Sequence, residues 1–176
     1  MRKLTVMKKL AVVLLLVVLC CSLAACFDGV ITEKQFFHVM TSIQYYPSDY
    51  VDMTLELDCF TYRLVDVNDN EYICGVRKCS SGYGCVCGND TIIGFVLQYD
   101  GELPEPRNQS EDTNDKTWVH LSGKLKSTDK LNIEIYSYKD GAIDLNNTEQ
   151  IQFLVFVVET CELIEDYSNL NYYVTK

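Results

Sequence analysis

The chain has 176 residues and a mass of 20.1 kDa, which is room for one domain of medium size. Residues 26–176 carry 11 Lys and Arg against 25 Asp and Glu, a net charge of −14. Because nucleic-acid binding depends mainly on cations that neutralise phosphates, this charge balance argues against a nucleic-acid partner. A hydrophobic content of 48% argues against intrinsic disorder.

The N-terminal residues predict a lipoprotein signal. Four cations lie within residues 1–9, and an uncharged apolar run extends from Leu10 to Cys21. The segment Leu23–Cys26 (LAAC) resembles the bacterial lipobox, in which a cysteine becomes the new N-terminus and carries the lipid. We therefore expect lipidation of Cys26, since two acyl chains on one residue give stable membrane anchoring. An uncleaved membrane anchor and ordinary secretion are the alternatives.

This N-terminus divides the chain into three parts. We expect a helical signal peptide over residues 1–25, a short tether over residues 26–30 and one folded domain over residues 31–176. The expected location of the folded domain is the outer, extracytoplasmic face of the cell membrane, where the lipid holds it.

The folded domain has the composition of a β-sheet protein. From Ile31 onward, Val, Ile, Thr, Tyr and Phe recur in short runs separated by turn residues, and no long stretch carries a clean helical stripe. Short strands that curl around one core predict a mainly β fold with a small barrel. The expected strands lie near Glu33–Gln44, Met53–Val65, Tyr72–Lys78, Thr91–Tyr99, Thr117–Lys126, Leu131–Tyr138, Gln152–Leu163 and Tyr172–Thr175.

The first of these segments, Glu33–Gln44, fits two interpretations. Thr32 followed by Gln35 is typical of a capping box that opens a helix. The β-rich run Phe37–Thr41 favours a strand. We expect a strand and keep the helix as the alternative.

Turn residues and one apolar run organise the remaining strands. Asn68–Asn70 and Lys139–Gly141 predict hairpin turns, and the polar stretch Gly101–Lys116 predicts a loop. Phe153–Val158 is apolar at every position, which indicates a central strand covered on both faces.

Several short segments occur in an order that is shared with a bacterial family. They are Ile31–Phe37, Tyr46–Tyr50, Val76–Arg77, Ile93–Phe95, Asp115–Val119, Ser122–Gly123 and Tyr173–Thr175. With these segments the chain resembles uncharacterised bacterial proteins named as the accessory subunit of a predicted permease, and related small lipoproteins with an OB-like domain. The resemblance covers Ile31–Lys176 and implies an OB-like barrel and a permease partner. The family typically has an adjacent Cys-Cys pair after the arginine, whereas the cysteines that follow Arg77 are separated.

Four cysteines follow a C-x4-C-x5-C-x-C pattern in a glycine-rich segment, which predicts a loop between strands. Disulfides suit the extracytoplasmic compartment. A tetrahedral zinc or copper site suits a cluster of soft thiolate ligands. Both interpretations stay open for these residues, as do free or redox-active thiols. The four are Cys74, Cys79, Cys85 and Cys87.

Two further cysteines, Cys59 and Cys161, lie within predicted strands beside apolar residues. They form either one cross-strand disulfide or two buried small hydrophobic residues. The histidines, His38 and His120, are more typical of packed or half-exposed residues than of ligands. His120 is a further candidate ligand only in the metal-binding interpretation.

The sequence contains no nucleophile elbow, no paired-histidine zinc helix and no phosphate-binding loop. We therefore expect no enzyme and no organic cofactor. The leading hypothesis is a membrane-anchored, non-catalytic binding or accessory module, for which the resemblance implies a permease partner. One alternative is a metal-handling protein that holds zinc or copper in the Cys-rich loop. Another is a thiol-disulfide protein in which Arg77 and Lys78 lower a thiol pKa.

Overall fold

The computed structural model describes residues 29–79, 91–107, 115–139, 142–171 and 173–174 of the chain. This part is mainly β, as predicted. The expected signal and Cys26 lie outside it. In chain order the elements are β1 (Val30–Ile31), α2 (Glu33–Tyr45), the 3-10 helix η1 (Pro47–Asp49), β2 (Leu55–Val65), β3 (Glu71–Cys79), β4 (Thr91–Gln98), β5 (Trp118–Lys139), β6 (Ala142–Leu163) and β7 (Tyr173–Val174).

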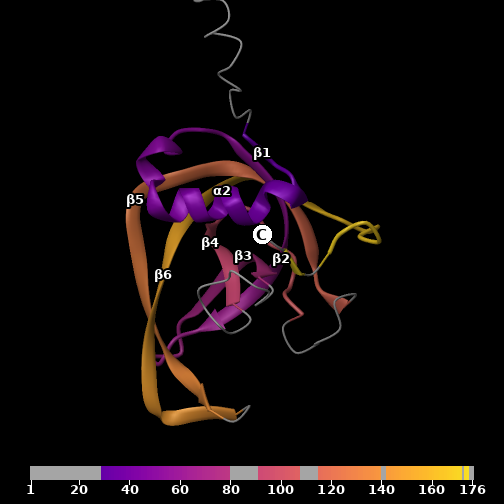
Figure 1. Ribbon diagram of the computed structural model, residues 1–176. Helices are drawn as coiled ribbons and strands as arrows, with labels where there is room; N and C mark the ends of the chain where they lie inside the picture. Colours follow the sequence, from indigo (N-terminus) through magenta and orange to yellow (C-terminus); the bar gives the residue numbers. More distant parts are fainter. Residues whose placement is uncertain (1–28, 80–90, 108–114, 140–141, 172, 175–176) are drawn as a thin grey trace, which may run out of the picture.

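Five strands form a ring (Figure 1). Their hydrogen-bonded order is β2-β5-β6-β4-β3, and β3 pairs in turn with β2, so the sheet closes on itself. β4 and β6 run parallel, and the other ring pairs are antiparallel. The short strands β1 and β7 add parallel pairings to β2 and β3. In Figure 1, α2 lies across the end of the ring beside β1, and the β5–β6 hairpin extends from the opposite end.

The segment Glu33–Gln44, expected as a strand, lies within the helix α2, so that prediction was wrong and the alternative holds. Thr32 is the residue before the helix, and its hydroxyl donates a hydrogen bond to Oε1 of Gln35 at 2.8 Å. Burial of one helical face against the strands outweighs the local β propensity. The buried residues of this face recur at helical spacing: Phe36, Met40 and Ile43.

Two predicted strands, Thr117–Lys126 and Leu131–Tyr138, are parts of the single strand β5, which pairs with β6 along its length. The register shifts between Leu125 and Lys130, so an irregularity in the pairing lies where the sequence indicated a break. The strand therefore continues through the polar residues 127–130, which separate the two predicted strands.

The predicted hairpins and the predicted central strand are confirmed. β2 and β3 pair up to Val65 and Glu71 around a turn in which Asp69 has a φ of 62°. Lys139 pairs with Ala142 at the tip of the β5–β6 hairpin. β6 lies between β5 and β4, so the apolar run Phe153–Val158 is in a central strand as predicted. Coverage of both faces was also expected, but Val155 and Val157 are only partly buried, so the second face is incompletely covered.

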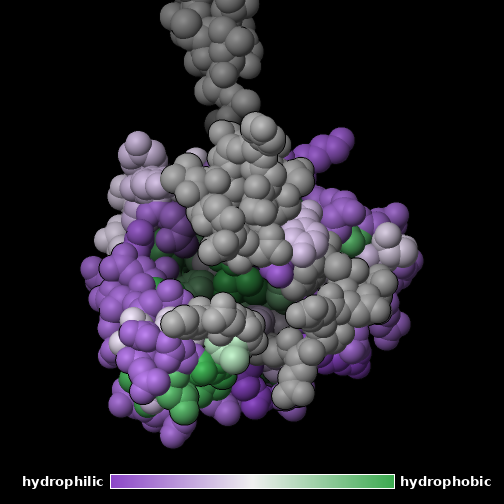
Figure 2. Space-filling view, turned by 60° about the horizontal axis from the view of Figure 1, so that its bottom comes forward, coloured by the Kyte–Doolittle hydropathy of each residue, from purple (hydrophilic) through white to green (hydrophobic). Residues whose placement is uncertain are grey.

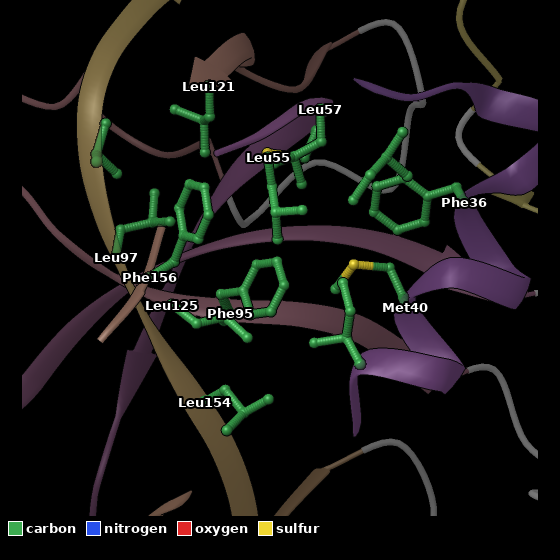
Figure 3. Close-up of a cluster of buried hydrophobic side chains, with 14 of the residues drawn as sticks. Phe36, Met40, Leu55, Leu57, Phe95, Leu97, Leu121, Leu125, Leu154 and Phe156 are labelled. Atoms are coloured by element: carbon green, nitrogen blue, oxygen red, sulfur yellow. The ribbon is translucent and has the colours of Figure 1, made fainter. Parts of the chain in front are cut away.

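The main hydrophobic cluster lies beneath α2 (Figure 3). The rings of Phe95 on β4 and Phe156 on β6 stack with 5.1 Å between their centroids. Full burial of each large apolar side chain contributes about 1.5–3 kcal/mol, so this cluster holds much of the fold's stability. Its other fully buried members include Phe36, Met40, Leu55, Leu121 and Leu154.

A second hydrophobic cluster surrounds Trp118 on β5 and Phe60 on β2, whose rings meet edge to face at 5.5 Å. Leu64 on β2 belongs to this cluster, whereas Leu55 and Leu57 belong to the first, so β2 contributes to both. The segment after β6 packs against the second cluster through Ile164, Tyr167 and Leu170.

Arg77 on β3 is fully buried and joins α2 to the ring and to the C-terminal segment. Its guanidinium carbon lies 5.4 Å from the ring centroid of Phe36 and 4.9 Å from that of Trp118. It forms an ion pair with Glu33 at 3.2 Å and donates a hydrogen bond to the carbonyl oxygen of Asn171. Burial lowers the pKa of Arg77, while Glu33 favours the charged form. The arginine that the sequence placed beside the Cys-rich segment is therefore a buried structural residue.

Candidate functional site

The structure separates the cysteines that the sequence groups together. Cys74 is fully buried in the middle of β3, within the predicted strand Tyr72–Lys78, so it does not belong to the Cys-rich loop in which the spacing also placed it. Cys79 is the last residue of β3, about 16 Å further along the strand. Cys85 and Cys87 lie outside the described residues. Within the described ranges, no three metal-binding side chains converge on one point.

The thiols of Cys59, Cys74 and Cys161 are free. Cys59 on β2 and Cys161 on β6 lie on opposite sides of β5, so about 10 Å separates them, which is beyond the reach of a disulfide. Burial raises the pKa of Cys74 to about 12 and also raises the pKa values of Cys59 and Cys161. A raised pKa keeps these three thiols protonated at neutral pH, and Cys59 and Cys74 are also buried away from solvent. Metal binding or disulfide formation by Cys79, Cys85 and Cys87 stays a prediction.

The two histidines lie on different elements, His120 on β5 and His38 on α2. Nδ1 of His120 on β5 lies 2.7 Å from a carboxylate oxygen of Asp58 on β2, and both side chains are about two-fifths exposed at 39% and 41%. His120 is thus the half-exposed strand residue that the sequence predicts. His38 lies on the exposed face of α2.

A groove of about 850 Å³ is the candidate functional site of the described residues. It lies between the end of β2, the β2–β3 turn, the connection that follows β4, and the tip of the β5–β6 hairpin. Figure 2, in which the bottom of Figure 1 comes forward, shows hydrophobic side chains gathered in a hollow on this side. Its volume falls in the range of ordinary ligand sites.

Backbone contacts fix the segments around the groove. The amide of Thr61 on β2 donates to the carbonyl of Thr117 at 2.9 Å, and the hydroxyl of Thr117 donates to the carbonyl of Glu105 at 2.7 Å. The amide of Val67 donates to the carbonyl of Glu134 on β5 at 3.0 Å. The groove is therefore built by segments up to about eighty positions apart in the sequence.

The apolar part of the groove comes from β2 and from the hairpin. Tyr62 and Tyr136 supply aromatic rings, and Ile135 lies beside Tyr136 on β5. Val65 is 45% exposed and Ile143 is 54% exposed, so two large aliphatic side chains face solvent in the same groove. Exposed apolar side chains that cluster in a hollow are typical of a binding surface.

The charged part of the groove is net acidic. Its lining holds two arginines and four carboxylates. Arg63 forms ion pairs with Glu105 and, at 3.4 Å, with Glu71, and Arg107 pairs with Asp115 at 3.1 Å. The remaining two carboxylates belong to Asp66 and Asp69.

Asp66 shapes the turn at the edge of the groove. Its carboxylate accepts hydrogen bonds from the side chain and the amide of Asn70 and from the amide of Asn68, each at 2.8 Å. The side-chain bond from Asn70, followed by these amide bonds, holds the pKa of Asp66 below its ordinary value. The carboxylate is therefore ionised at neutral pH, and the turn keeps a fixed negative charge.

The tip of the hairpin projects a further apolar side chain. Asp144 accepts hydrogen bonds from the side chain of Asn147 at 2.6 Å and from the amide of Asn146 at 3.0 Å, which lower the pKa of Asp144. These contacts order a bulge where the register shifts between Tyr136 and Ser137. Leu145 in this bulge is 70% exposed.

The described lining residues supply aromatic, aliphatic and ion-paired groups. This arrangement supports non-covalent recognition. The sequence gives little sign of it, because Tyr62, Arg63, Arg107, Tyr136 and Ile143 form no local motif. The sequence did predict the two hairpin turns, and both hairpins border the groove.

In the described residues, no helix is both long and apolar enough to cross a membrane. Comparison with known proteins found no match among curated proteins and none among solved structures. The family model of the DUF1980 C-terminal domain matches residues 28–152, which is more than two thirds of the chain and spans the elements from β1 into β6. The chain therefore belongs to the family of DUF1980 C-terminal domains.

Proposed function

We propose that this chain is an extracytoplasmic lipoprotein that acts as a non-catalytic binding or accessory module. Cys26 carries the lipid, and the domain that follows is an OB-like barrel. The groove at the end of the ring binds a segment of a partner protein. The observation that carries this proposal is the groove itself, in which exposed aliphatic side chains lie beside ion-paired arginines.

The order of the strands supports the OB-like description. Numbered by their order in the chain, the five ring strands follow one another as 1-2-3-5-4 and close from 4 to 1. OB folds bind ligands with the loop between strands 1 and 2 and the loop between strands 4 and 5. The corresponding turns here, β2–β3 and β5–β6, both border the groove.

The chemistry of the groove favours a polypeptide segment with basic and apolar side chains. Its carboxylates outnumber its arginines, so a cationic segment gains electrostatic attraction. Val65 and Ile143 offer apolar contacts, and the aromatic rings of Tyr62 and Tyr136 suit both aliphatic and cationic side chains. A region of a permease outside the membrane is the partner that the family resemblance implies.

Site-specific photocrosslinking in native membranes tests this proposal. A photoreactive amino acid replaces Tyr136 in the groove, and the control position is Glu159, which lies on β6 and pairs with Lys124 outside the groove. We expect the Tyr136 position to yield an adduct with an integral membrane transport protein that the Glu159 position does not yield. The substitution Ile143→Asp should remove this adduct.

Two outcomes would overturn the proposal. One is the absence of a transport protein from the adducts at Tyr136, and the other is the same adduct at Tyr136 and Glu159. The lipid anchor has its own test, because Cys26→Ala should release the protein or leave its precursor uncut. Unchanged processing and unchanged membrane retention would refute the lipobox.

A further inference from the structure

We propose that the exposed face of α2 lies against the bilayer surface and that the groove faces away from it. This inference rests on the lipid at Cys26 that the proposed function includes. The occupant of the α2 face is a phospholipid headgroup layer. Three observations support this: the length of the tether, the charge of the helix face and the position of the groove along β2.

The tether is too short to hold the domain away from the membrane. Gly29 follows Cys26 by three residues, which span at most about 11 Å when fully extended. The carbonyl of Gly29 accepts a hydrogen bond from the amide of Glu56 at 2.8 Å, so the domain side of the tether is fixed to the start of β2.

The backbone at this point of attachment has little freedom. Gly29 has a φ of 90°, and a Cβ there would lie 2.1 Å from the carbonyl oxygen of Thr54. Only glycine fits such a close approach, which keeps the tether beside β1 and α2. The end of the ring that bears α2 must therefore lie within about 11 Å of a lipid on Cys26.

The exposed face of α2 carries no carboxylate. Lys34, His38 and Tyr45 recur at helical spacing on it, and Tyr45 is 76% exposed. The acidic residue of the helix, Glu33, instead turns inward to Arg77. In a domain with a net charge of −14, a face with a lysine and no carboxylate is repelled less by anionic headgroups than an acidic face would be.

Two tyrosines give the face an interfacial character. Tyr45 and Tyr46 end α2 with exposed fractions of 76% and 65%. Tyrosine is enriched at membrane surfaces because its ring prefers the apolar side of the headgroup layer and its hydroxyl prefers water. Asp49 and Asp52 follow in the connection to β2 and mark the limit of the carboxylate-free face.

The groove lies at the other end of the same strand. Glu56 at the start of β2 pairs with β1 near the tether, whereas Val65 at its end lines the groove. The nine intervening steps correspond to about 30 Å along the strand. Figure 1 shows the same separation, with α2 and β1 at the top and the β5–β6 hairpin at the bottom. A membrane partner therefore reaches the groove only through a region that projects well beyond the bilayer surface.

Fluorescence quenching by bromine-labelled phospholipids tests this orientation. The processed lipoprotein is reconstituted into vesicles of zwitterionic and anionic phospholipids that carry bromine on their acyl chains. Tryptophan is introduced by Tyr45→Trp on α2 or, as the matched control, by Ile143→Trp in the groove. Both positions are exposed, and the native tryptophan, Trp118, is buried at 1% exposure and reports that each variant is folded.

We expect the tryptophan of Tyr45→Trp to lose most of its emission in brominated vesicles and to shift to the blue. That of Ile143→Trp should keep its emission. A second variant, Lys34→Glu with His38→Glu in the Tyr45→Trp background, should restore much of the lost emission by repulsion from the anionic headgroups.

The outcomes separate this inference from the proposed function. If the lipoprotein floats with the vesicles and quenching at Tyr45→Trp does not exceed that at Ile143→Trp, the orientation is overturned while the lipid anchor stands. If the protein does not float with the vesicles, the lipid anchor fails and this inference fails with it.

Discussion

Apolar and arginine side chains are buried at the α2 end of the ring and exposed at the groove end. At the α2 end, Phe36 and Met40 of the helix are fully buried, and so is Arg77, which pairs with Glu33. At the groove, Val65 and Ile143 are about half exposed, and the arginine ion pairs lie at the surface. Because buried contacts stabilise and exposed apolar surface does not, we expect substitutions at the α2 end to cost more stability than substitutions of the exposed groove residues, where we propose that recognition occurs.

Substitution of the buried Arg77 should lower the free energy of unfolding more than any groove substitution. Arg77→Ala removes a fully buried side chain that contacts Phe36 and Trp118, so we expect a loss of about 3–5 kcal/mol in the free energy of unfolding. The matched control, Arg107→Ala, breaks a pair whose side chains are more than half exposed and should cost less than about 1 kcal/mol. Urea unfolding measures both. Equal losses in the two variants would contradict the division between the ends.

A substitution at the closest backbone approach in the ring should have the next largest effect. A Cβ at Gly94 on β4 would lie 2.0 Å from the carbonyl oxygen of Gly75 on β3. We expect Gly94→Ala to lower the free energy of unfolding by about 1–3 kcal/mol, because the paired strands must move apart. Gly101→Ala, where the new Cβ meets only the side chain of Tyr99, is the control and should cost less. Thermal unfolding of both variants provides the comparison.

The stability of the α2 end should depend on pH through Glu33. Burial raises the pKa of Glu33, but the hydrogen bonds from Asn171 and the interaction with Arg77 together lower it by more. The folded-state pKa therefore lies below the ordinary value of 4.5. The unfolded state then binds the proton more readily. The stabilisation is therefore complete above pH 4.5 and is lost as the pH falls through the folded-state pKa.

Urea unfolding of the parent and of Glu33→Gln between neutral pH and pH 3 measures this dependence. The parent should lose more stability on acidification than the variant. The exposed replacement Glu159→Gln serves as the reference and should follow the parent. A variant curve with the same slope as the parent would exclude Glu33 as the group responsible.

The smallest effect on stability is expected at the groove. Ile143→Asp changes a side chain that is 54% exposed, so the free energy of unfolding should move by less than about 0.5 kcal/mol. The same substitution should remove the photocrosslink at Tyr136. A large loss of stability would show instead that Ile143 belongs to the core and would sharpen the boundary between the two ends.

Local patterns located the cores of most strands and failed for the helix, for the continuity of β5 and for the first half of β6. The alternation of Leu55 and Leu57 with polar neighbours, and the turn at Asn68–Asn70, predicted β2, β3 and their hairpin correctly. The segment that became α2 carries both β-branched residues and a capping pair, so its own sequence is ambiguous. The apolar face of the helix is buried by strands that occur later in the chain. Phe36 on this face, for example, contacts Arg77 on β3.

The sequence by itself determined the fold class, because alternation and turn residues act over a few positions. It also determined the acidic charge and the lipobox-like N-terminus from which the anchor is proposed. Only the tertiary structure decided that Cys74 is a core residue, that Arg77 is buried, and that Tyr62 and Ile143 share a groove. These features depend on pairings between segments far apart in the chain, and the periodicity of one strand carries no information about which distant segment will cover it.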